Sequence, residues 1–236
     1  MTSQHGEPGD GGVPADLAPR RERAVTFGGR YGALLLLLIA TYLVSAFTTG
    51  KLISGVQILV FVGAVLLALR NSQIAQWIAR LIVGVVFTGS AIAFGLAVSQ
   101  PSEAAVGVAE LWAGLVLLIA VVVLVRRVLA STTVTLESLY GAVSAYMIIG
   151  LMFAAFYAAM DKLGGVPFFA NGQPGDTRTF QYFSFTTLTT LGYGDFTAAG
   201  NAGRAVAVME AMFGQIFLAT LVARLVSAFQ PRERRK

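Results

Sequence analysis

The chain has 236 residues, of which 56% are hydrophobic and only 12% are charged. Because it contains no cysteine, disulfides, thiol catalysis and cysteine metal sites are excluded. The single histidine, His5, lies in a polar stretch, so we expect no histidine metal site, no histidine base and no enzyme activity. Basic residues that flank membrane spans account for the net charge of +5, which argues against a nucleic-acid partner.

Residues 1–29 are rich in glycine, proline and charged residues and contain almost no apolar run. A signal peptide would show a basic region, then a short apolar core, then a small-residue cleavage site, and this order is missing. We therefore expect residues 1–29 to form a disordered cytoplasmic tail.

Long apolar runs dominate the rest of the chain. About 18 consecutive apolar residues predict a transmembrane helix, because roughly 20 residues at about 1.5 Å each cross a hydrocarbon core of about 30 Å. In lipid the backbone finds no water to bond, so these segments must be helical. The predicted spans are residues 31–47, 52–69, 74–98, 104–125, 136–160 and 201–229.

Basic residues predict the orientation of these spans. If residues 1–29 lie in the cytoplasm, thirteen lysines and arginines fall on that side and four fall outside. The outer four are Lys51, Lys162, Arg178 and Arg204. This positive-inside bias requires six spans with both termini in the cytoplasm. The run at 177–189 is too short and too polar for a seventh span, so we expect it to enter from outside and return.

This short run leads into the most specific pattern of the sequence. Residues 186–195 read Thr-Thr-Leu-Thr-Thr-Leu-Gly-Tyr-Gly-Asp. The pattern resembles the pore signature of tetrameric potassium channels of the prokaryotic type, Thr-x-x-Thr-x-Gly-Tyr-Gly-Asp. The fixed positions of that signature are filled by Thr187, Thr190, Gly192, Tyr193, Gly194 and Asp195. We call residues 187–195 the signature segment.

The resemblance implies a selectivity filter. In this family, backbone carbonyls from four chains replace the water around a potassium ion. The matching carbonyls here are those of Thr190, Leu191, Gly192 and Tyr193, with the Thr190 hydroxyl as the innermost ligand. Successive carbonyls can face one axis only if the backbone alternates between left- and right-handed angles, which glycine permits at little steric cost. Gly192 and Gly194 meet this requirement.

Neighbouring residues are expected to support this filter. The run before it is expected to form a half-length pore helix whose carbonyl end carries partial negative charge and favours a cation. Thr187 and Asp195 support the filter from its two ends, and the Tyr193 side chain is expected to pack behind it. Family members often carry a glutamate in the pore helix behind the aspartate, and Thr186 occupies that position here.

The span at 201–229 matches the helix that lines the cavity in this family. Gly214 stands nineteen residues after Asp195, where family members commonly carry a hinge glycine. The alternative for Gly214 is a packing glycine, which is common in membrane helices.

Polar residues in this span have separate expected roles. Gln215, Leu218 and Val222 share a helical stripe that is expected to face the cavity. A free charge at the depth of Glu210 would be unfavourable, so Glu210 needs a partner or a proton. We expect a hydrogen bond from Glu210 to the pore helix, through its threonines or Ser184.

The fourth predicted span lacks the charges of a voltage sensor. A sensor needs arginines at every third position, because each charge that crosses the field contributes about 2.3 kcal/mol per 100 mV. Residues 104–125 contain no lysine or arginine, and Arg126 and Arg127 are adjacent. Only seven residues follow Phe229, so we also expect no cytoplasmic gating domain.

The resemblance is confined to about 136–229, which suggests a domain order. We expect a tail at 1–29, a four-helix scaffold at 30–130, a pore module at 131–230 and a short basic tail at 231–236. The scaffold packs either on its own pore module or on a neighbour's.

The sequence as a whole predicts an all-α membrane protein. It has six transmembrane helices, with a re-entrant pore helix and a selectivity-filter loop between helices 5 and 6. The expected function is passive potassium conduction through a homotetrameric pore in a prokaryotic plasma (inner) membrane. Its expected partners are potassium ions, lipids and three further copies, with no cofactor and no intrinsic voltage gating. The alternatives are a weakly selective cation channel and a non-conducting scaffold or regulatory subunit.

Overall fold

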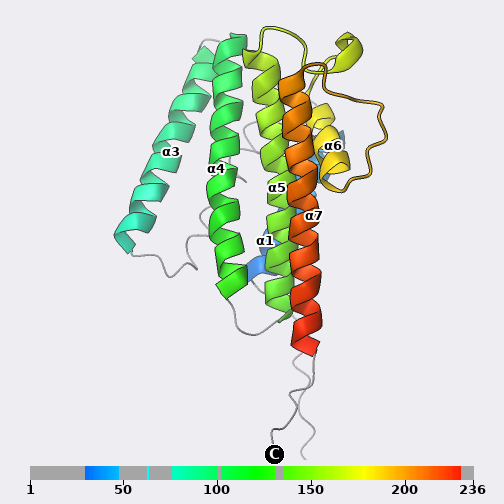
Figure 1. Ribbon diagram of the computed structural model, residues 1–236. Helices are drawn as coiled ribbons and strands as arrows, with labels where there is room; N and C mark the ends of the chain where they lie inside the picture. The colour runs from blue at the N-terminus through cyan, green and yellow to red at the C-terminus, as the bar shows by residue number, and fades with distance from the viewer. Residues whose placement is uncertain (1–29, 48–62, 64–75, 100–101, 131–134, 230–236) are drawn as a thin grey trace, which may run out of the picture.

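The computed structural model describes residues 30–47, 63, 76–99, 102–130 and 135–229. Within these ranges the regular secondary structure is helical, with one isolated β-bridge between Phe169 and Ala198 (Figure 1). The helices are α1 (Arg30–Phe47), α3 (Gln76–Ser99), α4 (Glu103–Ala130), α5 (Leu136–Leu163), the 3-10 turn η2 (Ala170–Gly172), α6 (Thr177–Leu188) and α7 (Asn201–Phe229). The predicted tails at 1–29 and 231–236 and the predicted span at 52–69 lie outside the described residues.

Three helices of the described part are long and apolar enough to cross a membrane. They are Glu103–Ala130, Leu136–Leu163 and Asn201–Ser227. Shorter apolar stretches lie at Tyr31–Phe47 and Ile82–Leu96. These helices indicate an integral membrane protein, and the total of six spans stays a prediction.

Two helices continue beyond the ends that the sequence predicted. The span expected at 104–125 runs on to Ala130, and the span expected at 136–160 runs on to Leu163. Charged residues end an apolar stretch but not a helix, since arginine and lysine have high helix propensity. A break in hydropathy therefore marked the expected membrane border, and the helical hydrogen bonds continue past it.

Side-chain caps fix where α5 and α6 begin. Thr135 and Ser138 form a reciprocal capping box, with Ser138 N donating to Thr135 Oγ1 at 3.2 Å and Thr135 N donating to Ser138 Oγ at 2.7 Å. At α6, Asp176 Oδ1 accepts from Thr179 N at 2.8 Å. The first α6 turn is therefore anchored by a negative charge at the positive end of the helix dipole.

Helix α5 is the centre of the bundle. It packs against α4, α1, α6 and α7, and α3 packs on the outer side of α4 (Figure 1). In the structure, α4 thus lies against the α5 of its own chain. Within the most apolar window of each helix, 72% of α5 is buried but only 11% of α7. Most of the surface of α7 is therefore left uncovered by its own chain.

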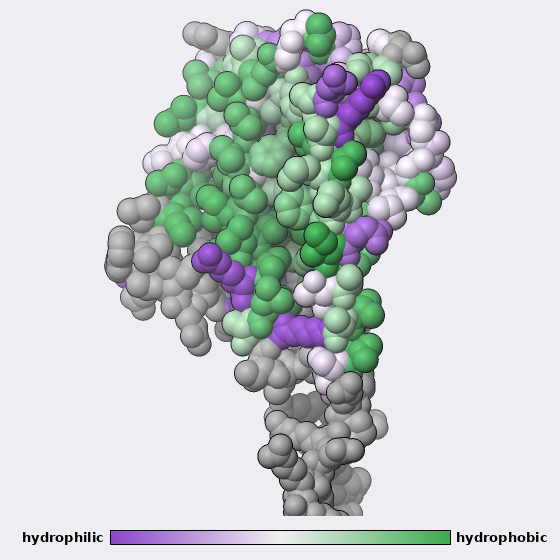
Figure 2. Space-filling model, in the orientation of Figure 1, coloured by the Kyte–Doolittle hydropathy of each residue, from purple (hydrophilic) through white to green (hydrophobic). Residues whose placement is uncertain are grey.

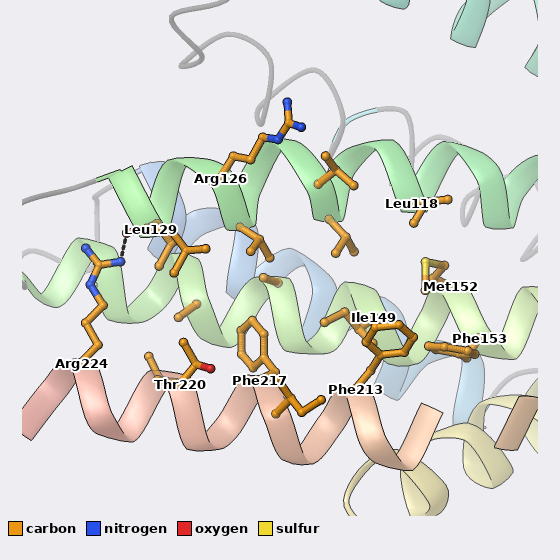
Figure 3. Close-up of a pocket in the computed structure, with 18 residues that line it drawn as sticks. Leu118, Arg126, Leu129, Ile149, Met152, Phe153, Phe213, Phe217, Thr220 and Arg224 are labelled. Atoms are coloured by element: carbon orange, nitrogen blue, oxygen red, sulfur yellow. Dashed lines mark hydrogen bonds between the residues drawn. The ribbon is translucent and has the colours of Figure 1, made fainter. Parts of the chain in front are cut away.

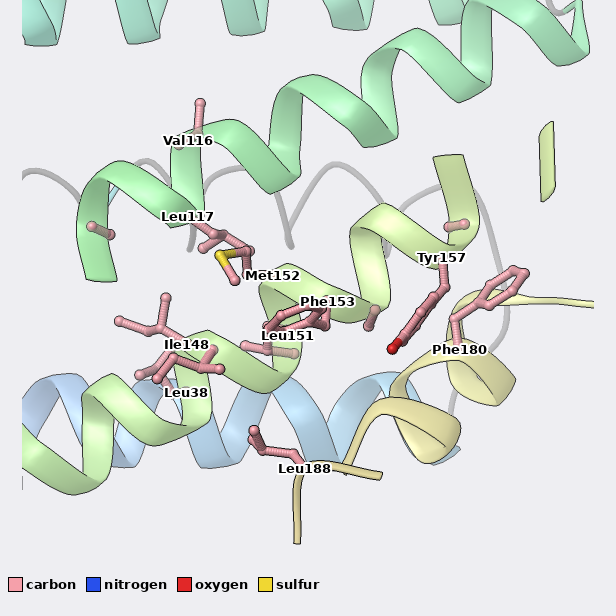
Figure 4. Packing of buried hydrophobic residues seen from close by; sticks show 14 of the residues in the cluster. Leu38, Val116, Leu117, Ile148, Leu151, Met152, Phe153, Tyr157, Phe180 and Leu188 are labelled. Atoms are coloured by element: carbon pink, nitrogen blue, oxygen red, sulfur yellow. The ribbon is translucent and has the colours of Figure 1, made fainter. Parts of the chain in front are cut away.

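The core is formed largely by one side of α5. Leu151 and Tyr157 of α5 are almost fully buried, together with Leu38 of α1, Leu117 of α4 and Leu188 of α6 (Figure 4). These side chains come from four helices and meet in one cluster. Helix α6 is thereby held at a fixed position against the bundle.

Aromatic contacts fix the connections on either side of α6. The rings of Phe169 and Phe180 stack with their centroids 5.1 Å apart. Ala170 N donates to Thr197 O at 2.8 Å, and Ala199 N donates to Phe168 O at 2.9 Å. The chain before α6 is therefore tied to the chain after the signature segment, which restrains both ends of the intervening loop.

Candidate functional site

The signature segment begins at the C-terminal end of α6. Thr190 N donates to Thr187 O at 2.9 Å. Leu191 N and Gly192 N both donate to Thr186 O, at 2.8 Å and 3.0 Å. These bonds turn the chain sharply back as it leaves the helix. The Thr186 and Thr187 backbones therefore hold the start of the segment, and the filter-support role of both residues stays a prediction.

The backbone of the segment alternates in handedness. Thr190, Gly192 and Gly194 have φ values of 58°, 49° and 78°, whereas Leu191 and Tyr193 are not in the positive-φ region. Glycine adopts such angles without steric penalty, and a threonine does so only when its surroundings enforce it. This alternation turns consecutive carbonyl groups toward the same side of the chain. The oxygens that result are neutral, hard ligands, which suit an alkali cation better than a transition metal.

The Thr190 side chain is held by two hydrogen bonds. Its hydroxyl donates to Thr189 O at 2.7 Å and accepts from Gln215 Nε2 of α7 at 3.1 Å. The segment is therefore attached to the helix stripe that was expected to line a cavity. Gln215, Leu218 and Val222 are exposed in the single chain, and so are residues 189–195.

Asp195 bonds to a residue that the sequence analysis did not select. Tyr182 OH of α6 donates to Asp195 Oδ2 at 2.9 Å, and the Tyr182 ring lies parallel to the Tyr193 ring at 6.4 Å. Thr186, at the position of the family's glutamate, instead donates its hydroxyl to Phe183 O at 3.0 Å. The sequence did contain a signal for this bond. Where the pore helix lacks the glutamate, a tyrosine in the same helix can supply the hydroxyl that bonds to Asp195.

Glu210 joins three helices in a buried cluster. Its side chain is 0% exposed. Tyr157 OH of α5 donates to Glu210 Oε2 at 2.6 Å, and Ser184 Oγ of α6 lies 2.5 Å from Glu210 Oε1. Ser184 Oγ also lies 2.6 Å from Gly150 O. Of the pore-helix partners that the sequence offered, Ser184 is therefore the one in contact, and Tyr157 was not anticipated.

Gly214 allows α7 to approach the end of α6 closely. Helix α7 is continuous through this residue, and a Cβ atom built on Gly214 would lie 2.2 Å from the Leu188 carbonyl oxygen. The same carbonyl accepts a hydrogen bond from Tyr146 OH at 3.1 Å. Gly214 thus has a packing role in the structure, and its role as a hinge stays a prediction.

The electrostatics of α6 point its negative end at the signature segment. At the opposite end, outside the long apolar helices, the pKa of Asp176 lies below its ordinary value of 3.8. Partial burial acts to raise that pKa, but hydrogen bonds from Thr179 and Arg178 and the Arg178 charge outweigh it. A negative Asp176 at the N-terminus and the carbonyl dipoles at the C-terminus both suit a helix aimed at a cation.

Comparison with known proteins matched one part of the chain. Residues 142–230 match a protein family described as an ion channel. The match covers most of α5, the signature segment, α6 and α7, and it leaves α1, α3 and α4 outside. Comparison with curated proteins gave no match. The family match, over these residues, therefore indicates an ion channel in an integral membrane protein.

Proposed function

We propose that the chain is one subunit of a potassium-selective channel that conducts passively through a homotetrameric pore. The observation that carries this proposal is the alternating backbone at Thr190, Gly192 and Gly194. A potassium ion can lose its water only where a cage of oxygens replaces it, and rows of inward carbonyls provide such a cage. The carbonyls of Thr190 to Tyr193, with the Thr190 hydroxyl innermost, are the proposed ligands.

The exposure of this segment supports a tetramer. Leu191 is 55% exposed and Tyr193 is 67% exposed in the single chain. Irregular backbone at membrane depth must be enclosed by protein or line water. One chain supplies one row of carbonyls, so a closed cage requires further copies around a common axis, and fourfold cyclic symmetry is the arrangement that this family uses. Gln215, Leu218 and Val222 then line the cavity below the filter.

The arrangement of charges supports the orientation and the absence of a voltage sensor. Helix α4 carries Arg126 and Arg127 near its C-terminal end and no basic residue between 104 and 125. We propose that this end faces the cytoplasm and that α6 is re-entrant from the outside. With no arginine in the centre of α4, this helix supplies no gating charge to move through the field.

Liposome flux tests the proposal. Purified protein in vesicles should pass potassium but not sodium when each is the only permeant cation, and barium should block the flux. Equal flux of both ions would favour the weakly selective channel. An absence of ion flux from an intact tetramer would favour the non-conducting subunit.

Variants of the signature segment test its assignment. Gly192→Ala and Tyr193→Ala should abolish selective flux while the tetramer still forms, because alanine at φ 49° is strained and removal of the ring takes away the spacer. Gly200→Ala is the matched control, since its added Cβ meets nothing within 4 Å and its φ is not positive. Selective flux that survives in Gly192→Ala would show that the filter lies elsewhere.

A further inference from the structure

Three polar side chains meet in the buried cluster around Glu210. Tyr157 of α5, Ser184 of α6 and Glu210 of α7 are each 0% exposed, so bulk water does not reach them. Tyr157 OH lies 2.6 Å from Glu210 Oε2, and Ser184 Oγ lies 2.5 Å from Glu210 Oε1. Ser184 Oγ also lies 2.6 Å from Gly150 O of α5. The cluster therefore contains three short contacts between oxygen atoms.

Each of these three contacts needs a proton. Distances of 2.5 Å and 2.6 Å are those of O–H···O hydrogen bonds, in which one of the two oxygens must carry the hydrogen. Serine and tyrosine hydroxyls carry one proton each, and a backbone carbonyl carries none. Tyr157 and Ser184 thus supply two protons for three hydrogen bonds. The third proton can come only from the carboxyl group of Glu210.

The direction of each hydrogen bond follows from this count. Gly150 O can only accept, so Ser184 donates to it and accepts from Glu210 Oε1. Tyr157 OH donates to Glu210 Oε2. A neutral carboxylic acid suits both of its neighbours, because one of its oxygens donates while the other accepts. An ionised carboxylate only accepts, and Ser184 would then have to give up either Gly150 or Glu210.

In the described part of the chain, the groups that face Glu210 carry no positive charge. On α5 these groups include the hydroxyls of Tyr157 and Tyr146. The one charged residue of α6, Arg178, lies in its first turn and forms an ion pair outside the cluster. On α7, Arg204 lies six residues before Glu210, about 9 Å along the helix. Since a free charge at this depth is unfavourable, the neutral carboxyl is the favoured form.

A large apolar pocket between α4, α5 and α7 also keeps its charged residues away from Glu210 (Figure 3). Its volume is about 480 Å³, and its charged lining residues are Arg126 and Arg224. Arg224 lies fourteen residues after Glu210, about 21 Å along α7. Figure 3 shows both arginines toward the end opposite Met152 and Phe153, and Figure 2 shows mostly hydrophobic side chains along the middle of the visible face. Neither arginine is therefore placed to compensate a charge on Glu210.

We propose that Glu210 is a neutral carboxylic acid whose proton joins α7 to Ser184 and so positions α6, the proposed pore helix. Loss of that proton would leave two protons for three contacts, and α6 would lose its attachment at Ser184 either to α5 or to α7. Glu210 is therefore a positioning residue whose effect depends on pH. The consequence for the filter rests on the proposed function, whereas the protonation of Glu210 does not.

Infrared difference spectra of the full chain test this protonation without ion flux. At neutral pH, wild type minus Glu210→Gln should show the carbonyl stretching band of a protonated carboxylic acid. Tyr157→Phe should shift this band to higher frequency, because the carbonyl oxygen no longer accepts a hydrogen bond. Glu110→Gln, which replaces an acid of α4 outside the cluster, is the matched control and should keep the band. If Glu210→Gln instead removed the bands of an ionised carboxylate, the proposal would be overturned.

Alkaline titration tests the consequence for α6. As the pH rises and the acid band disappears, the wild-type oligomer should melt progressively lower relative to Glu210→Gln, which has no proton to lose at this position. Tyrosine hydroxyls titrate in both proteins, so the difference between the two melting temperatures reports on Glu210. Loss of the band with no change in this difference would overturn the proposal.

Liposome flux over the same pH interval separates this inference from the proposed function. Potassium flux through wild type should fall as the acid band is lost, whereas flux through Glu210→Gln should not. Absence of flux at every pH, with the infrared and melting results as expected, would count against the proposed function and would support the proton on Glu210.

Discussion

Replacing Glu210 by alanine should loosen the attachment of α6 to the rest of the bundle. Glu210 is the only described residue whose side chain bonds to both Tyr157 of α5 and Ser184 of α6. Ser184 keeps an acceptor in Gly150 O at 2.6 Å, but Tyr157 is 0% exposed and would lose the acceptor that the carboxyl supplies. The main energetic loss in Glu210→Ala is therefore expected at the tyrosine.

The size of the loss follows from these contacts. A buried hydroxyl left unsatisfied costs about 1–3 kcal/mol. Side-chain hydrogen bonds between membrane helices contribute less, about 0.6 kcal/mol on average and about 1.7 kcal/mol at most. We therefore expect Glu210→Ala to lower the free energy of unfolding by about 1–3 kcal/mol. For a chain of this size, each kcal/mol lowers the melting temperature by about 2–4 °C.

Glu210→Gln is the matched control for this prediction. A glutamine can accept from Tyr157 OH through its oxygen and donate to Ser184 Oγ through its nitrogen, while Ser184 donates to Gly150 O. This variant should thus keep most of the stability and selectivity of the wild type. A combination of Tyr157→Phe with Glu210→Ala should show a coupling energy of about 0.6–1.7 kcal/mol.

Two measurements test whether the Glu210 cluster positions α6. Thermal retention of the oligomer in detergent gives the stability order, and liposome flux gives the ratio of potassium to sodium. We expect wild type and Glu210→Gln to resemble each other, and Glu210→Ala to melt lower and to discriminate less. If Glu210→Ala kept both properties, the cluster would not position α6. If Glu210→Gln failed like the alanine variant, a negative carboxylate would be needed instead.

Three further predictions concern residues around α6. Gly214→Ala should destabilise the oligomer by about 1–3 kcal/mol, because its Cβ would lie 2.2 Å from the Leu188 carbonyl oxygen. Gly95→Ala, whose Cβ would lie in open space, should not destabilise it. Equal melting temperatures of the two variants would refute this. Tyr182→Phe should preserve the tetramer but speed the loss of potassium flux with time, since Asp195 loses the 2.9 Å bond that holds it; an unchanged time course would contradict the role. Ionised Asp176 should stabilise the protein fully above its ordinary pKa of 3.8, and this effect should be lost as the pH falls through its lowered pKa in the folded protein. The melting temperatures of wild type and Asp176→Asn should therefore converge at the lowest pH. A constant difference between the two melting temperatures would refute this.

Much of the local structure could be predicted from the sequence. The helix expected at 177–189 ends at Leu188, and the helix expected at 201–229 has those bounds in the structure. The length of an apolar run and the identity of a capping residue are local features of the sequence, so the bounds of a helix can be predicted from them. The positive φ at Gly192 and Gly194 also follows from local chemistry, since only glycine takes this angle freely. At Thr190 the same angle was not foreseen, because there the surroundings impose it.

The contacts around the signature segment were decided by tertiary structure alone. Tyr157 and Glu210 are 53 residues apart, and Tyr182 and Asp195 are 13 apart. Which polar groups meet depends on the rotation and depth at which α5, α6 and α7 pack, and hydropathy leaves both undetermined. The sequence by itself thus predicted a helical membrane protein with a segment, between its last two helices, that resembles a potassium-channel signature. The packing of those helices decided which side chains hold that signature in place.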